Sequence, residues 1–397
     1  MSRTVGAVSR GIRTPIIREG DDLVNVVTKS LLEAFNEENI TLHDRDIVGV
    51  TEAVVARAQG NYASCDDIAA DIKAKFGDNT IGLIFPILSR NRFSIVLKGI
   101  ARGAKKIVLM LSYPSDEVGN HLVSLDQLDE KGINPWDTIM DEKMYRDNFG
   151  KNPHPFTQVD YVEFYKNLIL EENCEVEVIF ANRATDILGY TDTVLCADIH
   201  SRERSKRLLK AAGAKLVLGL DDILTAPVNG SGFNAGYGLL GSNKATEETI
   251  KLFPRDCKEF SLNLQESLLK ETGKKMEVLV YGDGAFKDPQ GKIWELADPV
   301  VSPGHTDGLI GLPNELKLKY LADNQFADLK GEELTKAMTE YIAHKNKDLM
   351  GSMESQGTTP RQLTDLIGSL CDLTSGSGDK GTPVIFIQGY FDNYAND

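Results

Sequence analysis

The spacing of hydrophobic and polar residues predicts an α/β unit at the amino end of this chain. Apolar side chains recur at helical spacing over residues 23–36, and residues 46–55 have the pattern of a buried strand that runs into Arg57-Ala-Gln-Gly60. A second amphipathic helix is expected over residues 66–76. We assign these elements to a first segment of the core, residues 1–84.

From about residue 85 the pattern of apolar residues changes, and short apolar runs alternate with segments of helical spacing. Strands are predicted at 105–111, 174–180, 193–197 and 215–219, and helices at 93–101, 159–172 and 201–212. Strands that alternate with helices pair in parallel through crossover connections. We therefore expect residues 85–227 to form an inserted, doubly wound α/β domain. Within it, the polar stretch 113–154 is expected to be a long loop or lid.

Beyond residue 227 the pattern returns to separate helices and strands. A helix is predicted at 256–272, a strand at 276–281, exposed helices within 314–348, and a last helix followed by a strand at 384–389. The expected fold class is therefore α/β. A mixed α+β core, formed by residues 1–84 and 228–397, would carry the insert 85–227.

A glycine turn connects the last helix to the last strand. Residues 374–382 read Thr-Ser-Gly-Ser-Gly-Asp-Lys-Gly-Thr, so three glycines stand beside a lysine. Glycines let the backbone approach a ligand, and successive N–H groups in such a turn can form a concavity that binds anions. The turn predicts a phosphate site, and an ordinary helix-to-strand turn is the alternative. The residues expected to contact phosphate there are Gly376, Ser377, Gly378, Lys380 and Gly381.

Two further strand ends carry candidate chemistry. Asp283 lies between two glycines just after the strand 276–281, where its carboxylate could bind a divalent metal such as magnesium or manganese. A tight Gly-Asp-Gly turn is the alternative explanation. At the other strand end, Thr51, Arg57 and Gly60 follow the first buried strand, and an arginine there can form paired hydrogen bonds with phosphate oxygens. The alternative is an ordinary surface strand end that terminates at a glycine.

Composition narrows the possible partners. The net charge of −15 disfavours nonspecific binding to nucleic acid or to an anionic membrane surface. Five widely spaced cysteines without a CxxC pair favour neither a disulfide framework nor a zinc ribbon. The chain shows neither a signal-peptide pattern nor ~18 consecutive apolar residues, so a cytoplasmic protein is expected.

In order along the chain, these segments resemble the coenzyme F420-0:L-glutamate ligases, the family of gamma-glutamyl ligases that extend the tail of a deazaflavin cofactor. The similar segments are Glu19–Leu23, Asp46–Gly60, Asn234–Asn243, Leu252–Asp256, Asp283 and Asp365–Gly389. Together they cover about half of the chain, at its two ends. Their shared order and spacing carry the resemblance.

The resemblance implies a ligase that forms a gamma-glutamyl-type amide bond through an acyl phosphate, with GTP or ATP as co-substrate and Mg or Mn as metal. A small-molecule carboxylate acceptor and an amino acid would be its substrates, and the protein would be a homodimer. Asp283 and Lys380 are the expected catalytic residues, with Asp283 and Asp379 as metal ligands. Arg57 and Lys380 would hold phosphates, while Ser242 and Asn243 would contact the nucleotide or the acceptor.

Departures from the family pattern keep two alternatives open. The family's Asn-Ala-Gly-x-Asp segment reads Asn234-Ala-Gly-Tyr-Gly238 here, so one metal-binding carboxylate is missing from its position. A non-catalytic protein that binds a nucleotide or another anionic metabolite is therefore one alternative. An oxidoreductase is the other, in which the insert 85–227 would be a Rossmann-like nucleotide-binding module, although its strands lack a glycine fingerprint. Outside the insert, Gly236-Tyr-Gly-Leu-Leu-Gly241 matches GxGxxG but follows a loop.

Overall fold

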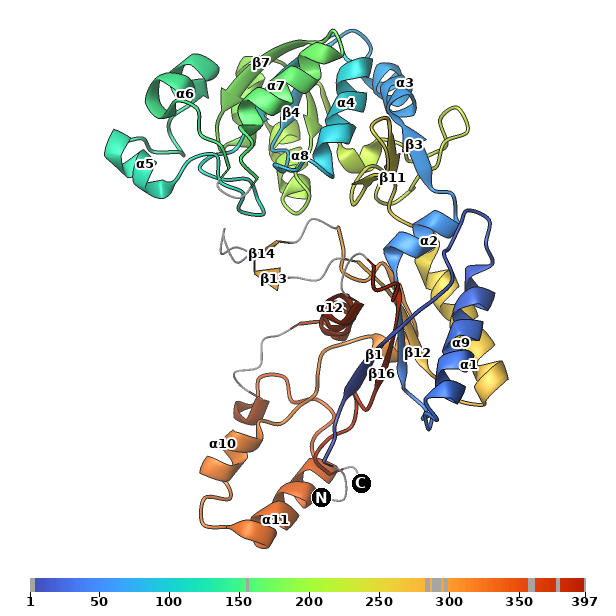
Figure 1. Ribbon diagram of the computed structural model, residues 1–397. Helices are drawn as coiled ribbons and strands as arrows, with labels where there is room; N and C mark the ends of the chain where they lie inside the picture. Colours follow the sequence, from blue (N-terminus) through green and yellow to red (C-terminus); the bar gives the residue numbers. More distant parts are fainter. Residues whose placement is uncertain are drawn as a thin grey trace.

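The computed structural model describes residues 4–154, 157–282, 299–355, 361–375 and 379–395, and the backbone at 286–287 and 294–295, where β13 (Phe286–Lys287) pairs with β14 (Trp294–Glu295). Two lobes, each built on a central sheet, lie one above the other in Figure 1. The chain therefore adopts an α/β fold, as the sequence predicts.

The first lobe, called here the five-stranded lobe, contains both ends of the chain. Its sheet has the order β1-β16-β2-β12-β15. The strands are β1 (Val8–Ile12), β16 (Val384–Gln388), β2 (Ile47–Thr51), β12 (Glu277–Tyr281) and β15 (Gly304–His305). Strands β2 and β12 are parallel, whereas β16 runs antiparallel to both β1 and β2. Segments from the two ends of the sequence thus lie side by side in one sheet (Figure 1).

Alternation along β2 explains why helices cover both faces of this sheet. Val48 and Val50 belong to the apolar cluster that includes α1 (Leu23–Glu37) and α9 (Cys257–Thr272), while Ile47 belongs to the cluster of α12 (Leu363–Ser375). Gly49 lets α12 approach closely, because a Cβ atom at residue 49 would lie 2.5 Å from the Cys371 sulfur. All five cysteines are buried and free.

The second lobe, called here the six-stranded lobe, has the sheet order β6-β7-β5-β4-β8-β9. Its strands are β6 (Met140–Asp141), β7 (Glu175–Phe180), β5 (Lys106–Leu111), β4 (Thr80–Ile84), β8 (Thr193–Cys196) and β9 (Leu216–Gly219). All adjacent pairs are parallel except β6 with β7. One apolar cluster includes α3 (Cys65–Phe76), α4 (Phe93–Gly103) and α7 (Tyr161–Glu171), and a second includes residues of α8 (Arg202–Ala211).

Three predicted features differ from the structure. The buried strand expected over residues 46–55 is β2, which ends at Thr51 because α2 (Glu52–Ala58) begins at the next residue. Residues 80–84, where the sequence pattern predicts no strand, form β4, which pairs with β5 and β8, while the division into core and insert as a whole stays a prediction. The loop expected over 113–154 contains α5 (Leu125–Lys131) and α6 (Glu142–Phe149). A capping box at Ser124 and the stacking of Tyr145 on Phe180 fix these two helices.

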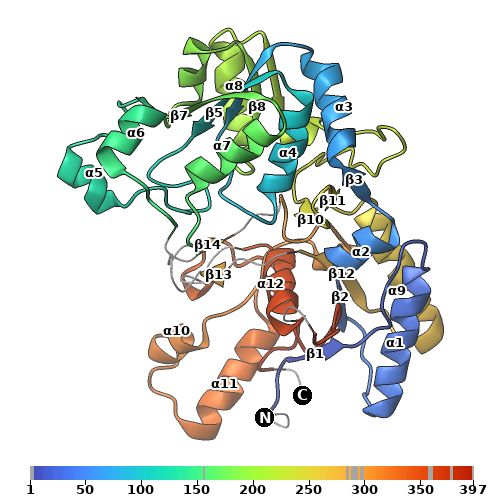
Figure 2. The same cartoon turned by 45° about the horizontal axis from the view of Figure 1, so that its top comes forward.

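A small sheet and a helical projection complete the fold. The sheet has the order β10-β11-β3, with β10 (Asn243–Lys244), β11 (Thr249–Lys251) and β3 (Tyr62–Ser64). The projection contains α10 (Leu318–Asp323) and α11 (Gly331–Ala343), which extend away from the sheets in both views (Figures 1 and 2). Short 3-10 helices occur at Ala184–Gly189, Leu220–Asp222, Asp307–Leu309 and Met353–Ser355. In the described part of the chain, no helix is both long and apolar enough to cross a membrane.

Candidate functional site

A cavity of about 390 Å³ opens where β2 ends and the chain leads into β16; we call it the turn cavity. The Thr51 N–H donates to the Pro383 carbonyl at 2.9 Å, and the Tyr281 hydroxyl donates to the same carbonyl at 3.4 Å. The Thr14 N–H donates to the carbonyl of Gly381 at 3.4 Å. Segments far apart in sequence are therefore held together around one space.

Three of the residues predicted to bind phosphate meet in the turn cavity. Thr51, Arg57 and Gly381 all line it. Asp379 and Lys380 form an exposed turn directly before Gly381. Asp283, Gly376, Ser377 and Gly378 lie outside the described residues.

The walls of the turn cavity combine apolar and polar groups. Pro15, Ile17 and Val54 supply apolar surface, and Tyr281 lines the cavity with its side chain 2% exposed. Burial raises the pKa of the Tyr281 phenol well above its ordinary value of 10, although a hydrogen bond with Ser375 opposes this. The phenol thus stays protonated at neutral pH and remains a hydrogen-bond donor.

A second and larger cavity, of about 670 Å³, lies against the β10–β11 hairpin; we call it the hairpin cavity. Four cationic side chains line it together with one carboxylate, Glu19. The cations are Arg18, Arg57, Lys244 and Lys251. Asn243, predicted to contact nucleotide or acceptor, lines the same cavity.

Arg57 is the one described residue that lines both cavities. It lies in the last turn of α2 and is exposed. Its guanidinium makes no ion pair or hydrogen bond with the described residues, and the same holds for the side chain of Arg18. Two solvated guanidinium groups therefore face cavities in a chain whose net charge is −15.

Gly60 shapes the backbone beside the two cavities and does not itself line either of them. It follows α2 with a φ of 58°, a value that favours glycine. A Cβ atom at residue 60 would lie 2.5 Å from the carboxyl group of Glu19. Gly60 thus turns the chain and makes room for Glu19, which lines the hairpin cavity.

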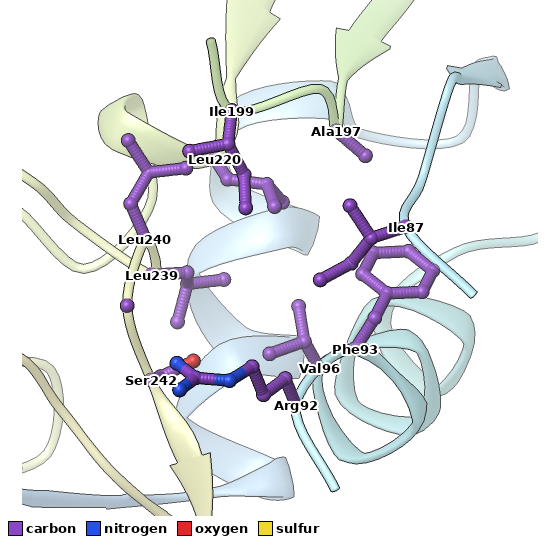
Figure 3. Close-up of a pocket in the computed structure, with 11 residues that line it drawn as sticks. Ile87, Arg92, Phe93, Val96, Ala197, Ile199, Leu220, Leu239, Leu240 and Ser242 are labelled. Atoms are coloured by element: carbon purple, nitrogen blue, oxygen red, sulfur yellow. The ribbon is translucent and has the colours of Figure 1, made fainter. Parts of the chain in front are cut away.

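Ser242 lies apart from the other predicted phosphate ligands. It is 4% exposed and lines a small cavity of about 20 Å³ in the six-stranded lobe, which holds roughly one water molecule. Figure 3 shows Ser242 and the Arg92 guanidinium beside each other at one end of this cavity, with Ile87, Phe93, Leu220 and Leu239 among its apolar walls.

Asn234, the first residue of the family-like segment 234–243, connects two loops through hydrogen bonds of its side chain. The Asn234 amide donates to the carbonyls of Phe253 and Pro254, both at 3.0 Å, and its side-chain oxygen accepts the N–H groups of Gly236 and Tyr237. Asn61 likewise donates to the Phe253 carbonyl at 2.8 Å, and its oxygen accepts from Arg255. These side chains satisfy buried backbone groups and fix the loops near the hairpin.

Gly238 occupies the position where the family pattern has aspartate, and the structure has no room there for a side chain. Its φ is 53°, and a Cβ atom would lie 2.5 Å from the carbonyl oxygens of both Leu220 and Ile223. The neighbouring Leu239 N–H donates to the Leu220 carbonyl at 2.9 Å. The loop is thus packed directly against the six-stranded lobe.

The described residues do not form a metal-binding set. No group of three or more acidic, histidine or cysteine side chains is placed to hold a metal ion in the part of the chain that the structure describes. Asp379 lies alone in an exposed turn. The predicted metal site thus depends on Asp283, which lies outside the described residues.

The GxGxxG string does not form a dinucleotide-binding turn. Residues 235–241 are turns that follow no strand and open no helix. The turn between β4 and α4, residues 85–92, where such a fingerprint would have to lie, contains no glycine.

The cavity residues absent from the predicted site residues include Arg18, Tyr281, Lys244 and Lys251. A usable signal existed for Lys251, because Thr249 and Lys251 flank the buried Ile250 in a strand-like alternation. For Arg18 and Tyr281 the sequence offered no local pattern, since their partners come from distant segments.

Comparison with known proteins agrees with the resemblance noted above. A family model described as F420-0:Gamma-glutamyl ligase matches residues 11–389, which includes both lobes and both cavities. No curated protein matches the chain.

Proposed function

This chain belongs to the F420-0:gamma-glutamyl ligase family, and we propose that it is a ligase that joins an amino acid to a carboxylate acceptor with a nucleoside triphosphate, GTP or ATP, as co-substrate. One observation carries the proposal. Thr51, Arg57 and Gly381, which come from distant parts of the chain, line one cavity at the end of β2.

The turn cavity is suited to a nucleotide. Its apolar walls, which include Pro15, Ile17 and Val54, can hold a base or ribose, and the Arg57 guanidinium can form paired hydrogen bonds with phosphate oxygens. Lys380 adds a second positive charge in the adjacent turn. The roles of Gly376, Ser377 and Gly378 as phosphate contacts remain predictions.

The proposed reaction has two steps. An oxygen of the acceptor carboxylate attacks the γ-phosphorus, the bond to the bridging oxygen breaks, and the nucleoside diphosphate leaves. The amine of the amino acid then attacks the acyl carbon of the acyl phosphate, inorganic phosphate leaves, and the nitrogen loses a proton to give the amide. Arg57 would offset the negative charge that the first step brings together.

Three further expectations accompany this proposal. The metal requirement stays a prediction that rests on Asp283 and Asp379, and none of the steps above is assigned to a metal. The homodimer and the cytoplasmic location also stay predictions, which light scattering and cell fractionation would test.

A non-catalytic anion-binding protein is the second candidate, and Gly238 favours it. The position has no space for the carboxylate of the family pattern, so a phosphate could bind without being transferred. This alternative predicts nucleotide binding without release of diphosphate or phosphate.

Calorimetry followed by a turnover assay tests the proposal. GTP and ATP would each be titrated into the full chain with Mg or Mn present, and into the Arg57→Gln variant. Lys270→Gln, on the exposed side of α9, is the matched control. The ligase proposal requires that at least one nucleotide bind, that Arg57→Gln weaken binding about tenfold or more, and that F420-0 and glutamate yield an amide with release of diphosphate. No binding of either nucleotide would overturn it, and binding without turnover would select the second candidate.

A further inference from the structure

One side-chain hydrogen bond closes the turn between α12 and β16 at the edge of the turn cavity. Ser375, the last described residue of α12, and Thr382, two residues before β16, both line this cavity. The Thr382 hydroxyl donates to the Ser375 carbonyl at 2.9 Å. The bond thus ties the end of a helix to the approach of a strand, and Gly381, which also lines the cavity, lies between the two tied residues.

The carbonyl that accepts this bond lies at the C-terminal end of α12. The last carbonyls of a helix have no partner within the helix, and they carry the negative end of the helix dipole. Such an oxygen beside the cavity repels an anion unless a donor covers it. Thr382 supplies a donor to the Ser375 carbonyl and so reduces this repulsion, in a cavity that the Arg57 guanidinium also lines.

The strand side of the same turn has separate anchors. Backbone hydrogen bonds described above hold the carbonyls of Gly381 and Pro383 to the loop after β1 and to the end of β2. These bonds fix the strand side of the turn to the central sheet. The Thr382 hydroxyl adds the tie from there to Ser375, so the positions of the two sides are coupled through one hydroxyl group.

Strand β1 gives the Thr382 side chain a fixed place. Gly11 of β1 is directly opposite Ile385 of β16 in antiparallel register. A Cβ atom at residue 11 would lie 3.0 Å from the Cβ of Thr382 and 3.3 Å from its hydroxyl oxygen. The Thr382 side chain therefore packs over the bare backbone of Gly11, and a side chain at residue 11 would push it aside.

We propose that Thr382 is a positioning residue for the phosphate groups of the nucleotide. Its hydroxyl keeps the turn closed, so that Gly381 and the adjacent Lys380 stay beside the cavity that Arg57 lines, and it covers a carbonyl that would oppose an anion. This inference rests on the proposed function for the identity of the ligand, but binding of inorganic tripolyphosphate can be measured without a nucleotide and without turnover.

The test compares two probes on the full chain by calorimetry at one fixed metal concentration. Inorganic tripolyphosphate carries the phosphate charges without a base or ribose. The second probe is GTP or ATP, whichever binds the wild type more tightly. An effect on the phosphates alone appears equally in both Kd values, whereas an effect on the base or ribose appears only in the second.

The variants change the hydrogen bond in three ways. Thr382→Val removes the hydroxyl and keeps the branched shape, Thr382→Ser keeps the hydroxyl and loses a methyl group, and Gly11→Ala crowds the hydroxyl without removing it. Thr339→Val is the matched control. The Thr339 hydroxyl also donates to a backbone carbonyl at 2.9 Å, that of Thr335, but it belongs to α11, which extends away from the sheets (Figure 1). Thermal unfolding verifies that each variant is folded.

The expected result is a graded loss of phosphate binding. Thr382→Val should weaken both probes by the same factor, about tenfold, because the carbonyl loses its donor and the turn loses its tie. Thr382→Ser should stay within about twofold of the wild type, and Gly11→Ala should fall between these two variants. Thr339→Val should change neither Kd by more than about twofold, although it loses a hydrogen bond of the same kind.

Three results would overturn the inference while leaving the proposed function intact. They are equal binding of both probes by wild type and Thr382→Val, a loss in Thr382→Ser as large as that in Thr382→Val, and a loss confined to the nucleotide. If the wild type binds tripolyphosphate with the expected pattern among the variants but binds no nucleotide, the ligase proposal fails and the role of Thr382 at a phosphate site stands. If the wild type binds neither probe, both proposals fail.

Discussion

The two lobes each contain parallel strands whose ends could form a ligand site, and in the part of the chain that the structure describes these ends differ in how open they are. In the five-stranded lobe, β2 and β12 end at a cavity of about 390 Å³. In the six-stranded lobe, strand order reverses between β4 and β8, where doubly wound proteins commonly bind ligands. The cavity there has room for about one water molecule.

Side chains of the chain itself close the six-stranded edge. The Asp116 carboxylate accepts the backbone N–H groups of Leu88 at 2.7 Å and Asn120 at 2.8 Å. Glu117 accepts those of His200 and Ser201 at 3.1 and 3.2 Å. These carboxylates supply the acceptors that a bound anion would otherwise supply, so the backbone donors of this edge are already satisfied.

The five-stranded edge has the opposite electrostatics. Its cationic groups are Arg57, which lines the turn cavity, and Lys380, which lies in an exposed turn. Arg57 has no ion-pair partner among the described residues. Strand ends of both sheets are therefore possible ligand sites, and the side chains at those ends decide whether a ligand can enter.

The largest expected effect comes from removing the guanidinium of Arg57, which lines both cavities. Arg57→Gln should lower kcat/KM for ligation by about 10²–10³-fold, because a preorganised charge at the developing transition state is lost. Arg92→Gln, at the closed edge, should change kcat/KM less than twofold. Steady-state kinetics of both variants measures the difference. Equal losses from both would mean that the six-stranded edge takes part in catalysis and that the comparison drawn above is wrong.

A second prediction concerns the contact between the loop at Gly238 and the six-stranded lobe. Gly238→Ala should lower the free energy of unfolding by roughly 2–4 kcal/mol, since the new methyl group meets two backbone oxygens at a positive φ. Gly236→Ala is the matched control, because the nearest atom to its Cβ, the Asn234 side-chain oxygen, is 3.8 Å away. Urea unfolding of both variants provides the measurement. A small change at Gly238 would show that the loop and the six-stranded lobe can separate without cost.

Local patterns in the sequence predicted most of the regular elements but not which strands pair with one another. The apolar spacing of α1, α3, α4, α7 and α9 indicated each helix close to its observed bounds. The sequence pattern predicts no strand at β4, whose pairing partners β5 and β8 come later in the chain. Strand pairing depends on distant segments, and a local pattern does not reveal it.

The same limit applies to the candidate site. That Thr51, Arg57 and Gly381 meet at one cavity could be predicted because each lies near the end of a clear strand, where α/β proteins place ligand groups, while their role as phosphate ligands stays a prediction. Ser242 was expected among them on its similarity to a family segment, but its backbone enters the six-stranded lobe and its side chain is buried there. Asn61 gave no local signal, because its amide donates to the backbone of Phe253, far along the chain. Asn234 opens the family-like segment, but its hydrogen bond to the Phe253 carbonyl could not be predicted from that segment.

A third prediction tests how the six-stranded edge is kept closed. The Tyr165 hydroxyl accepts the Ser89 N–H and donates to the Ile87 carbonyl, both at 2.7 Å, and so holds the loop that follows β4. Tyr165→Phe should lower the free energy of unfolding by about 1–3 kcal/mol, since both backbone groups lose a buried partner. Tyr190→Phe, at an exposed tyrosine, is the control and should change it by less than about 0.5 kcal/mol. Nucleotide affinity should not change in either variant, and a change in Tyr165→Phe would connect the closed edge to the open one.

The smallest effect is a pH dependence at the same closed edge. Burial raises the pKa of the Asp116 carboxyl from an ordinary 3.8 to about 6, and the hydrogen bonds from Leu88 and Asn120 only partly oppose it. Between those two values the folded state binds a proton that the unfolded state does not. The stabilisation from this proton is therefore complete below pH 3.8 and is lost as the pH rises through about 6.

Comparing Asp116→Asn with the wild type isolates this contribution from the other titrating groups. From pH 7 to pH 5 the wild type should gain about 1–2 kcal/mol in unfolding free energy relative to Asp116→Asn, because asparagine binds no proton in this range. Asp126→Asn, at an exposed position, is the matched control for the loss of one carboxylate. Urea unfolding at the two pH values measures both differences. A parallel pH response in wild type and Asp116→Asn would mean that Asp116 is ionised at pH 5 in the folded state. Solvent would then reach the six-stranded edge as readily as the open edge beside Arg57.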